Sequence, residues 1–172
     1  MDYIAAPWRE TYVRTCHTER GCVFCRAHRK GDDRAAGILH RGRHAFVILN
    51  KFPYLPGHLM VAPFRHLSAY DRSPKAVSDE MADLAKLSLR VLRARYRPHG
   101  FNAGMNLGRS AGAGVTGHFH LHIVPSWTGD SNFMPIVGRT RVVLEDLETT
   151  YDRLAPLFRT WGRRSRRPAR QS

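Results

Sequence analysis

The chain has 172 residues, and its 28 Lys and Arg residues outnumber its 14 Asp and Glu residues, which gives a formal net charge of +14 at pH 7. The length predicts one domain, and a hydrophobic content of 42% is enough for one core, which argues against a chain that is disordered throughout. No apolar run approaches the roughly 18 residues of a membrane span, no secretory signal is visible, and the charge predicts an anionic partner: a nucleotide, a polyphosphate, a nucleic acid or an anionic membrane surface.

Three cysteines lie near the N-terminus: Cys16, Cys22 and Cys25, of which the last two form a Cys-x-x-Cys pair. An odd number of cysteines without a secretory signal does not indicate a disulfide framework. The pair is then half of a metal site or a redox motif, but a redox motif should follow a strand, and none is evident before Cys22. We therefore favour half of a zinc site, whose two further ligands are to be sought among the ten histidines.

Short segments rich in β-branched and aromatic residues predict four strands, over residues 44–50, 58–62, 101–107 and 118–124. The first two flank a loop that contains Pro53, Pro56 and Gly57, so we expect them to pair antiparallel. A glycine-rich loop from Gly108 to Gly114 precedes the last strand.

Apolar residues at helical spacing predict two helices. The first is expected to begin at Ser73-Pro74, with Ser73 as its N-cap, and to end before Pro98. The second is expected over about 141–158, where Pro156 is an unfavourable residue. Together these elements predict an α+β fold: a mostly antiparallel sheet with one long and one C-terminal helix packed against it.

Residues 159–172 contain six arginines and no acidic residue, so we expect a disordered tail. A solvated extension and an arm that contacts anions both fit this composition. The rest of the chain, residues 1–158, is expected to be a single domain with a zinc-binding segment at its N-terminus.

Three histidines alternate with apolar residues in the last predicted strand. Because strand side chains alternate between faces, His118, His120 and His122 should share one face, opposite Phe119, Leu121 and Ile123. Such a row could lie on an exposed edge strand, bind a metal, or supply a nucleophile. A nucleophile beside the glycine-rich loop is the interpretation we favour, because the backbone N–H groups of such a loop bind phosphate oxygens.

The segment His118-Phe-His-Leu-His-Ile-Val-Pro125 resembles the His-x-His-x-His signature of the histidine-triad (HIT) superfamily. The segment Asn50-Lys-Phe-Pro-Tyr-Leu-Pro-Gly-His58 resembles the upstream part of the same fold. Three further segments resemble a narrower branch, the bacterial diadenosine tetraphosphate phosphorylases: Met1 to Arg14, Cys22 to Cys25, and Ser126 to Phe133. The resemblance covers about residues 3–158 and implies a HIT-like fold.

The resemblance also implies roles for individual residues. His120 would attack the α-phosphorus and become nucleotidylated, and His122 would donate a hydrogen bond to phosphate oxygens. Asn50 would contact the ribose and Asn106 the phosphates. Further substrate contacts would come from the glycine-rich loop and a base pocket, and they comprise Gly108, Ser110, Gly114, Thr116, Phe46, Ile48 and Trp127. For Phe46 and Ile48, a position in the core is an equally good interpretation.

Zinc-bearing relatives bind their metal through two cysteines, a distal histidine and the first histidine of the triad. The matching residues here are Cys22, Cys25, His66 and His118, and four ligands with no open position imply a structural zinc ion. Reduced thiols and bound zinc fit a cytoplasmic location.

The implied function is nucleotidyl transfer through a covalent nucleotidyl-histidine intermediate, with phosphorolysis of diadenosine tetraphosphate to ATP and ADP as the leading reaction. A dinucleoside polyphosphate hydrolase, and a specialised nucleotidyltransferase or phosphoramidase in a biosynthetic pathway, are the alternatives. The expected partners are the nucleotide, inorganic phosphate and, by analogy with relatives, a second copy in a homodimer or larger homo-oligomer. Nucleic acid is not expected to be the main partner, because no nucleic-acid recognition motif precedes the basic tail. No membrane partner is expected.

Overall fold

The computed structural model of the chain describes residues 21–129 and 145–165, with side chains as far as Gly162. The expectations that concern residues 1–20, 130–144 and 166–172 therefore lie outside the described residues. They are the N-terminal part of the family resemblance, the segment after Gly129, the first residues of the C-terminal helix and the end of the Arg-rich tail.

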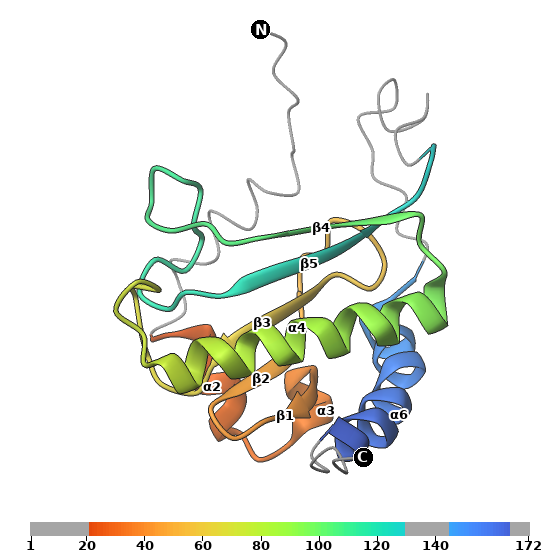
Figure 1. Cartoon of the computed structure of the whole chain (residues 1–172), viewed down its shortest axis with the longest axis horizontal. Coiled ribbons are helices and arrows are strands. Elements are labelled where there is room, and N and C mark those ends of the chain that lie inside the picture. Colours follow the sequence, from red (N-terminus) through yellow and green to blue (C-terminus); the bar gives the residue numbers. More distant parts are fainter. Residues whose placement is uncertain (1–20, 130–144, 166–172) are drawn as a thin grey trace, which may run out of the picture.

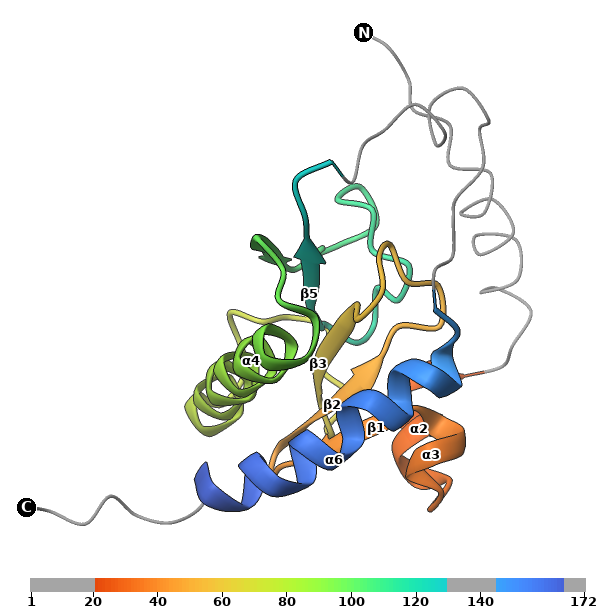
Figure 2. The same cartoon turned by 90° about the vertical axis from the view of Figure 1, so that its right-hand side faces the viewer.

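A five-stranded antiparallel sheet forms the centre of the fold (Figure 1). In spatial order its strands are β1 (Ile38–Arg41), β2 (Ala45–Leu49), β3 (Leu59–Pro63), β5 (Leu121–Ser126) and β4 (Gly100–Gly104). One face is covered by α4 (Lys75–Tyr96) and α6 (Leu147–Ser165), and the other carries α2 (Val23–Arg29), with α3 (Asp33–Ala36) beside it (Figure 2). The predicted α+β class is confirmed.

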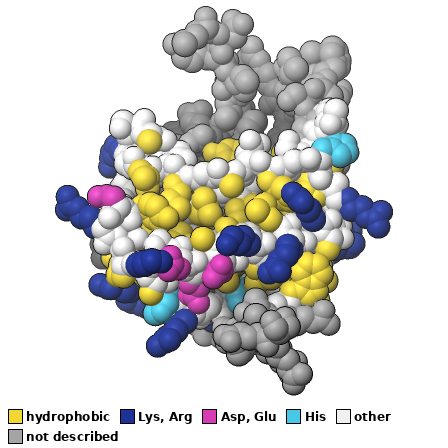
Figure 3. All heavy atoms as spheres, in the orientation of Figure 1, with side chains coloured by type: hydrophobic (Ala, Val, Ile, Leu, Met, Phe, Trp, Pro, Cys, Tyr) yellow, Lys and Arg dark blue, Asp and Glu magenta, His cyan; other side chains and the backbone are white. Residues whose placement is uncertain are grey.

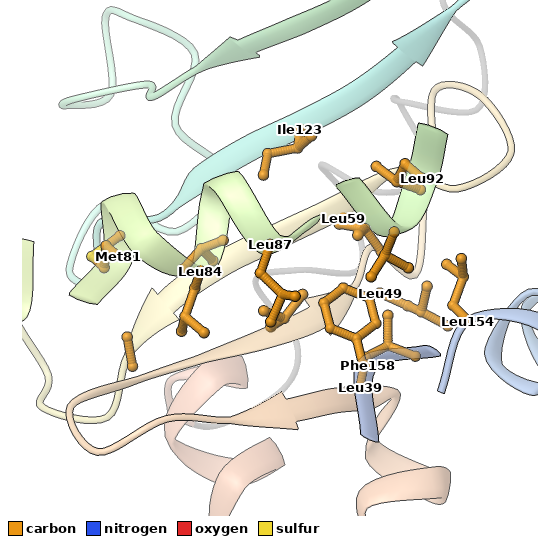
Figure 4. Close-up of a cluster of buried hydrophobic side chains, with 14 of the residues drawn as sticks. Leu39, Leu49, Leu59, Met81, Leu84, Leu87, Leu92, Ile123, Leu154 and Phe158 are labelled. Carbon is orange, nitrogen blue, oxygen red and sulfur yellow. The ribbon is translucent and has the colours of Figure 1, made fainter. Parts of the chain in front are cut away.

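The main core lies between the sheet and the two long helices (Figure 4). It contains the helical positions that the apolar spacing predicted, such as Met81, Leu84 and Leu92 from α4. Phe119 and Ile123 also lie in this core, which confirms that the apolar residues between the histidines face away from them. A smaller cluster on the other face packs Phe24 of α2 against Phe46 and Met60 of the sheet.

The predicted β2–β3 pair is present, with strand ends within a residue of those expected. The last strand, however, begins at Leu121 instead of 118. Its ladder with β3 stops at the pair Val61 and Leu121 because Pro63 has no N–H to donate, and the Pro63 carbonyl instead accepts from the His118 ring at 2.9 Å. The strand predicted over 101–107 is shorter and ends at Gly104.

The helix ends also differ from expectation. The N-cap of α4 is Pro74, and the Ser73 hydroxyl instead donates to the Tyr70 carbonyl at 2.7 Å. Helix α6 continues through Pro156 to Ser165, so residues 159–165 are helical and not part of a disordered tail. Trp161 packs against the main core, which stabilises this extension.

The surface is basic on the face that α4 occupies, where Lys and Arg side chains surround an apolar area (Figure 3). In the part of the chain that is described, no helix is long and apolar enough to cross a membrane.

Candidate functional site

His120 is held with one ring nitrogen directed at a fixed acceptor. Its Nδ1 lies 3.0 Å from the carbonyl oxygen of His118, so Nδ1 carries the proton and the lone pair is on Nε2. Only 6% of the residue is exposed, and this burial lowers the pKa of His120, although its hydrogen bond to the His118 carbonyl works the other way. His120 is therefore a neutral imidazole whose Nε2 can act as a nucleophile or base.

His122 has the opposite arrangement, which His58 imposes on it. The backbone N–H of Tyr54 donates to Nδ1 of His58 at 3.0 Å, so His58 is protonated on Nε2 when neutral. Nε2 of His58 lies 3.0 Å from Nδ1 of His122 and donates to it. The proton of a neutral His122 is then on its Nε2, where it can donate to a substrate.

Both histidines line a cavity of about 320 Å³ between α2, α3, β2 and the loops that follow β2 and β4. Apolar side chains from α2 and the sheet form one wall, among them Val23, Phe24 and Met60. Cationic side chains also line it: Arg26, Lys30 and Lys51. The cavity thus combines an apolar surface, positive charge and two histidines with complementary hydrogen-bonding states.

The cavity contains about half of the predicted substrate and catalytic residues. The sequence-predicted residues that line it are His120, His122, Asn50, Asn106, Gly114 and Ile48. Gly108, Ser110, Thr116 and Trp127 do not line it. Phe46 does not line it either, because its side chain is fully buried in the smaller core, stacked on Phe64 with ring centroids 5.1 Å apart. The expectation that Phe46 forms a base pocket is therefore not supported.

Asn106 has a role that the sequence did not reveal. Its amide donates to the carbonyl of Ala111 at 2.7 Å and so fixes the glycine-rich loop next to the cavity. Two glycines in this loop, Gly108 and Gly112, have φ of +91° and +83°, a conformation that a residue with a Cβ rarely adopts.

Sequence reasoning missed the three cationic residues and helix α2, which carries Arg26 and is followed directly by Lys30. Val23, Phe24 and Ala27 have the spacing of an apolar helix face, so the pattern of α2 was present but short. Lys51 follows Asn50 directly, and that neighbour was the available signal for it.

The four predicted metal ligands come together. Cys22 is the N-cap of α2 and Cys25 lies in its first turn, so the Cys-x-x-Cys pair does open a helix; within the described ranges no strand precedes it. Sγ of Cys22 lies 3.2 Å from Nδ1 of His118, and Sγ of Cys25 lies 3.4 Å from Nδ1 of His66. One ligand atom from each of the four residues lies within 4.8 Å of the others.

The protonation state of His118 suits metal binding. Its Nε2–H donates to the Pro63 carbonyl, so the Nδ1 lone pair faces the sulfur atoms. Burial lowers the pKa of His118 to about 4, with nearby His66 and His120 contributing. Burial and the neighbouring Cys22 raise the pKa of Cys25, which a divalent cation at this point would reverse. Two cysteines and two histidines whose ligand atoms lie this close together fit a tetrahedral zinc site.

The class to which this fold and histidine row belong is established by comparison with known proteins. The model of the HIT domain family matches residues 34–128, which is more than half of the chain. The chain belongs to the HIT domain family, as its histidine motif indicated.

Among individual relatives, the chain is 42% identical over 118 residues to a protein from Mycobacterium tuberculosis named AP-4-A phosphorylase; the match covers 69% of this chain and 60% of that protein. In structure it is similar to a hypothetical histidine triad nucleotide-binding protein from Sulfolobus tokodaii, with a TM-score of 0.66 and 27% identity over 83% of this chain and 95% of that one. A zinc-bound histidine triad family protein from Mycobacterium smegmatis has the same fold, with a TM-score of 0.66 and 24% identity over 84% and 97% of the two chains.

Proposed function

We propose that the chain transfers a nucleotidyl group from a dinucleoside polyphosphate to inorganic phosphate, and that it converts diadenosine tetraphosphate and phosphate to ATP and ADP. The observation that carries this proposal is the pair of fixed tautomers: His120 presents a lone pair to the cavity and His122 presents an N–H. The similarity to the mycobacterial AP-4-A phosphorylase supports the choice of substrate.

In the first half of the reaction, Nε2 of His120 attacks the α-phosphorus. A bond forms between nitrogen and phosphorus, the bond to the bridging oxygen breaks, and ATP leaves with that oxygen. The Nδ1–H of His120 donates to the His118 carbonyl, which stabilises the positive ring that forms when Nε2 is bonded to phosphorus. The N–H of His122 donates to a phosphate oxygen and stabilises the developing charge.

In the second half, an oxygen of inorganic phosphate attacks the same phosphorus. The nitrogen–phosphorus bond breaks, ADP forms, and His120 returns to its neutral state. Transfer through a covalent intermediate replaces one difficult step by two in-line displacements.

The cavity supplies the recognition that such a substrate needs. The phosphate chain is negatively charged, and three cationic side chains that line the cavity would offset this charge: Arg26, Lys30 and Lys51. The apolar wall from α2 and Ile48 suits a nucleobase. We assign Asn50 to the ribose, because it lines the cavity next to Lys51.

We also propose that Cys22, Cys25, His66 and His118 hold a structural zinc ion. All four positions would be filled by protein ligands, so the ion would cross-link α2 to the segments that contain His66 and His118 and take no part in the chemistry.

The test is turnover of diadenosine tetraphosphate with and without inorganic phosphate, with the products identified. We expect ATP and ADP only when phosphate is present. His120→Ala should reduce turnover by about 10³-fold or more, and mass spectrometry should detect an adenylyl group on the wild-type chain but not on this variant. Cleavage to ATP and AMP without phosphate would instead identify a hydrolase, and full activity of His120→Ala would exclude His120 as the nucleophile.

A further inference from the structure

Exposed aromatic side chains stand at the mouth of the cavity. In the described part of the chain, the large hydrophobic residues with the most exposed surface are Phe52 (43%), Tyr54 (43%), Tyr70 (37%) and Leu107 (49%). Phe52 and Tyr54 both line the cavity, and Leu107 directly follows Asn106, which lines it too. Isolated exposed apolar residues need no explanation, but a group of them beside a binding cavity indicates a binding surface.

The loop that carries these rings is held in place by its own hydrogen bonds. The side chain of Asn50 accepts from the backbone N–H of Phe52 at 2.9 Å, and the N–H of Tyr54 donates to His58. Pro53 lies between the two aromatic residues and restricts the backbone further. Because the backbone that carries the rings is already held, a ligand that stacks on them loses little free energy in ordering the loop.

One of these rings, that of Tyr54, stacks on the histidine that donates to His122. Tyr54 stacks on His58, with ring centroids 5.1 Å apart and an interplanar angle of 15°, and His58 donates to His122. The apolar wall from α2 is a separate surface of the same cavity, formed by Val23, Phe24 and Ala27. The cavity thus has two surfaces suited to flat apolar groups, and a dinucleoside polyphosphate has two bases.

We propose that Phe52 and Tyr54 form a stacking subsite for the second base, which belongs to the nucleotide that departs. Through this subsite the enzyme selects dinucleoside polyphosphates over mononucleoside polyphosphates with the same scissile bond. The inference rests on the proposed function, because it assumes that His120 attacks the phosphorus nearest the first base.

The test compares diadenosine tetraphosphate with adenosine 5′-tetraphosphate, which has the same scissile bond but no second base. The quantity measured is the ratio of their kcat/KM values in the wild type and in three variants: Phe52→Ala, Phe52→Leu and Phe52→Tyr. Stacking on an aromatic ring favours a base enough for this ratio to fall about 5-fold to 100-fold in Phe52→Ala. Leucine should restore the ratio only in part, and tyrosine should restore it.

A ratio that is unchanged in Phe52→Ala would overturn the inference, including the case in which both substrates lose activity equally because the loop is disturbed. Binding of the same two nucleotides to His120→Ala protein, with and without Phe52→Ala, separates this inference from the proposed reaction. Tighter binding of the dinucleotide that depends on Phe52 supports the subsite even if no adenylyl transfer occurs. Equal binding of the two nucleotides to His120→Ala protein overturns it.

Discussion

At the scale of single residues, the site depends on which nitrogen of each histidine carries a proton. His120 and His122 lie two residues apart with ring centroids 4.7 Å apart, yet their Nδ1 atoms have opposite roles. Nδ1 of His120 donates to a carbonyl, and Nδ1 of His122 accepts from His58. One ring is therefore prepared to accept at Nε2 and the other to donate, although the two side chains are chemically identical.

This arrangement predicts that His58 acts as a positioning residue for His122. In His58→Leu the donor to His122 is lost, so its tautomer is no longer fixed, and we expect kcat to fall about 10-fold to 100-fold with little change in KM. In His58→Gln the amide N–H can still reach Nδ1 of His122, and most of the activity should remain. Steady-state kinetics of the two variants measures the difference.

Thermal unfolding of both variants provides the control, because His58 is 1% exposed and either change disturbs the core. If kcat falls equally in the two variants, and in proportion to the fall in Tm, then His58 contributes to packing and does not position His122.

The histidine row itself was predictable from its two-residue spacing, because alternation in an extended chain puts the three rings on one side. The tautomers of His118 and His122 were not predictable, since they depend on the Pro63 carbonyl and on His58, which lie far from the row in sequence. The tautomer of His120 depends on the direction of the His118 carbonyl, which the residue spacing does not give. For Phe46, the sequence predicted a position in a strand. It could not show whether the ring contacts a ligand or packs on Phe64, because that depends on tertiary structure.

At the scale of secondary structure, one carboxylate fixes the turn between β1 and β2 to helix α4. The side chain of Glu80 accepts from the backbone N–H groups of Arg43, His44 and Ala45, at 2.7 Å from Arg43 and 2.8 Å from Ala45. Burial of Glu80 opposes its ionisation, but the three donors outweigh this and lower its pKa.

We expect Glu80→Gln to destabilise the fold by about 1–3 kcal/mol at pH 7, because three backbone donors lose an ionised acceptor. Since the pKa of Glu80 is lower in the folded state, its contribution is complete above the unfolded value of about 4.3 and is lost as the pH falls through the folded value. Urea unfolding at several pH values should therefore show the wild type and the variant converging below about pH 4.

Asp83→Asn is the matched control on the same helix. Its carboxylate is 76% exposed and lies 3.7 Å from Lys86, so its removal should change the free energy of unfolding by less than about 0.5 kcal/mol. A difference between Glu80→Gln and wild type that is constant with pH would contradict the role of the ionised carboxylate.

Helix α6 packs closely against β1 through a glycine. A Cβ at Gly162 would lie 2.3 Å from Cε1 of His40, so the helix or the ring must move. Alanine is favoured over glycine in a helix by about 1 kcal/mol, yet we expect Gly162→Ala to destabilise the fold by about 1–3 kcal/mol because of this overlap.

A double-mutant cycle with His40→Ala isolates the contact. In the His40→Ala background, Gly162→Ala should be neutral or stabilising, as measured by urea unfolding. If Gly162→Ala lowers the free energy of unfolding equally in both backgrounds, the contact with His40 is not the cause of the destabilisation.

The long helix and the β2–β3 hairpin were predictable because their apolar patterns are long or bounded by proline and glycine. The extension of α6 to Ser165 was not, because six arginines in the segment 159–172 suggested a solvated tail. Trp161 packs on the core, and Gly162 packs against His40. Both contacts join segments that are distant in sequence, so the local residue pattern does not reveal them.

At the scale of the whole molecule, helix α2 connects the proposed zinc site with the cavity. Its N-terminal end carries Cys22 and Cys25, whose sulfur atoms lie close to His118 and His66. Its next residues, including Phe24 and Ala27, form a wall of the cavity. Phe24 also contacts the rings of His118 and His120, with centroids 5.1 and 4.7 Å apart. A change in the position of α2 would therefore reach the ring of His120 directly.

Cys22→Ser and Cys25→Ser should each lower the zinc content of the purified chain from stoichiometric to a small fraction, because a hydroxyl is a poor replacement for a thiolate. Since the ion would link α2 to two other segments, we expect the Tm to fall by about 5–10 °C. The KM for the dinucleotide should rise as the cavity wall loosens. Metal analysis, calorimetry and kinetics on the same preparations measure these effects.

Cys16→Ser supplies the matched control, because the four-ligand set is complete without Cys16. This variant should keep its zinc, its Tm and its KM. If zinc is absent from the wild type, or if Cys22→Ser and Cys16→Ser have the same zinc content, the proposed metal site is wrong. In that case the sulfur atoms would stabilise α2 by packing and hydrogen bonding alone, and adding a chelator to the wild type should leave its Tm unchanged.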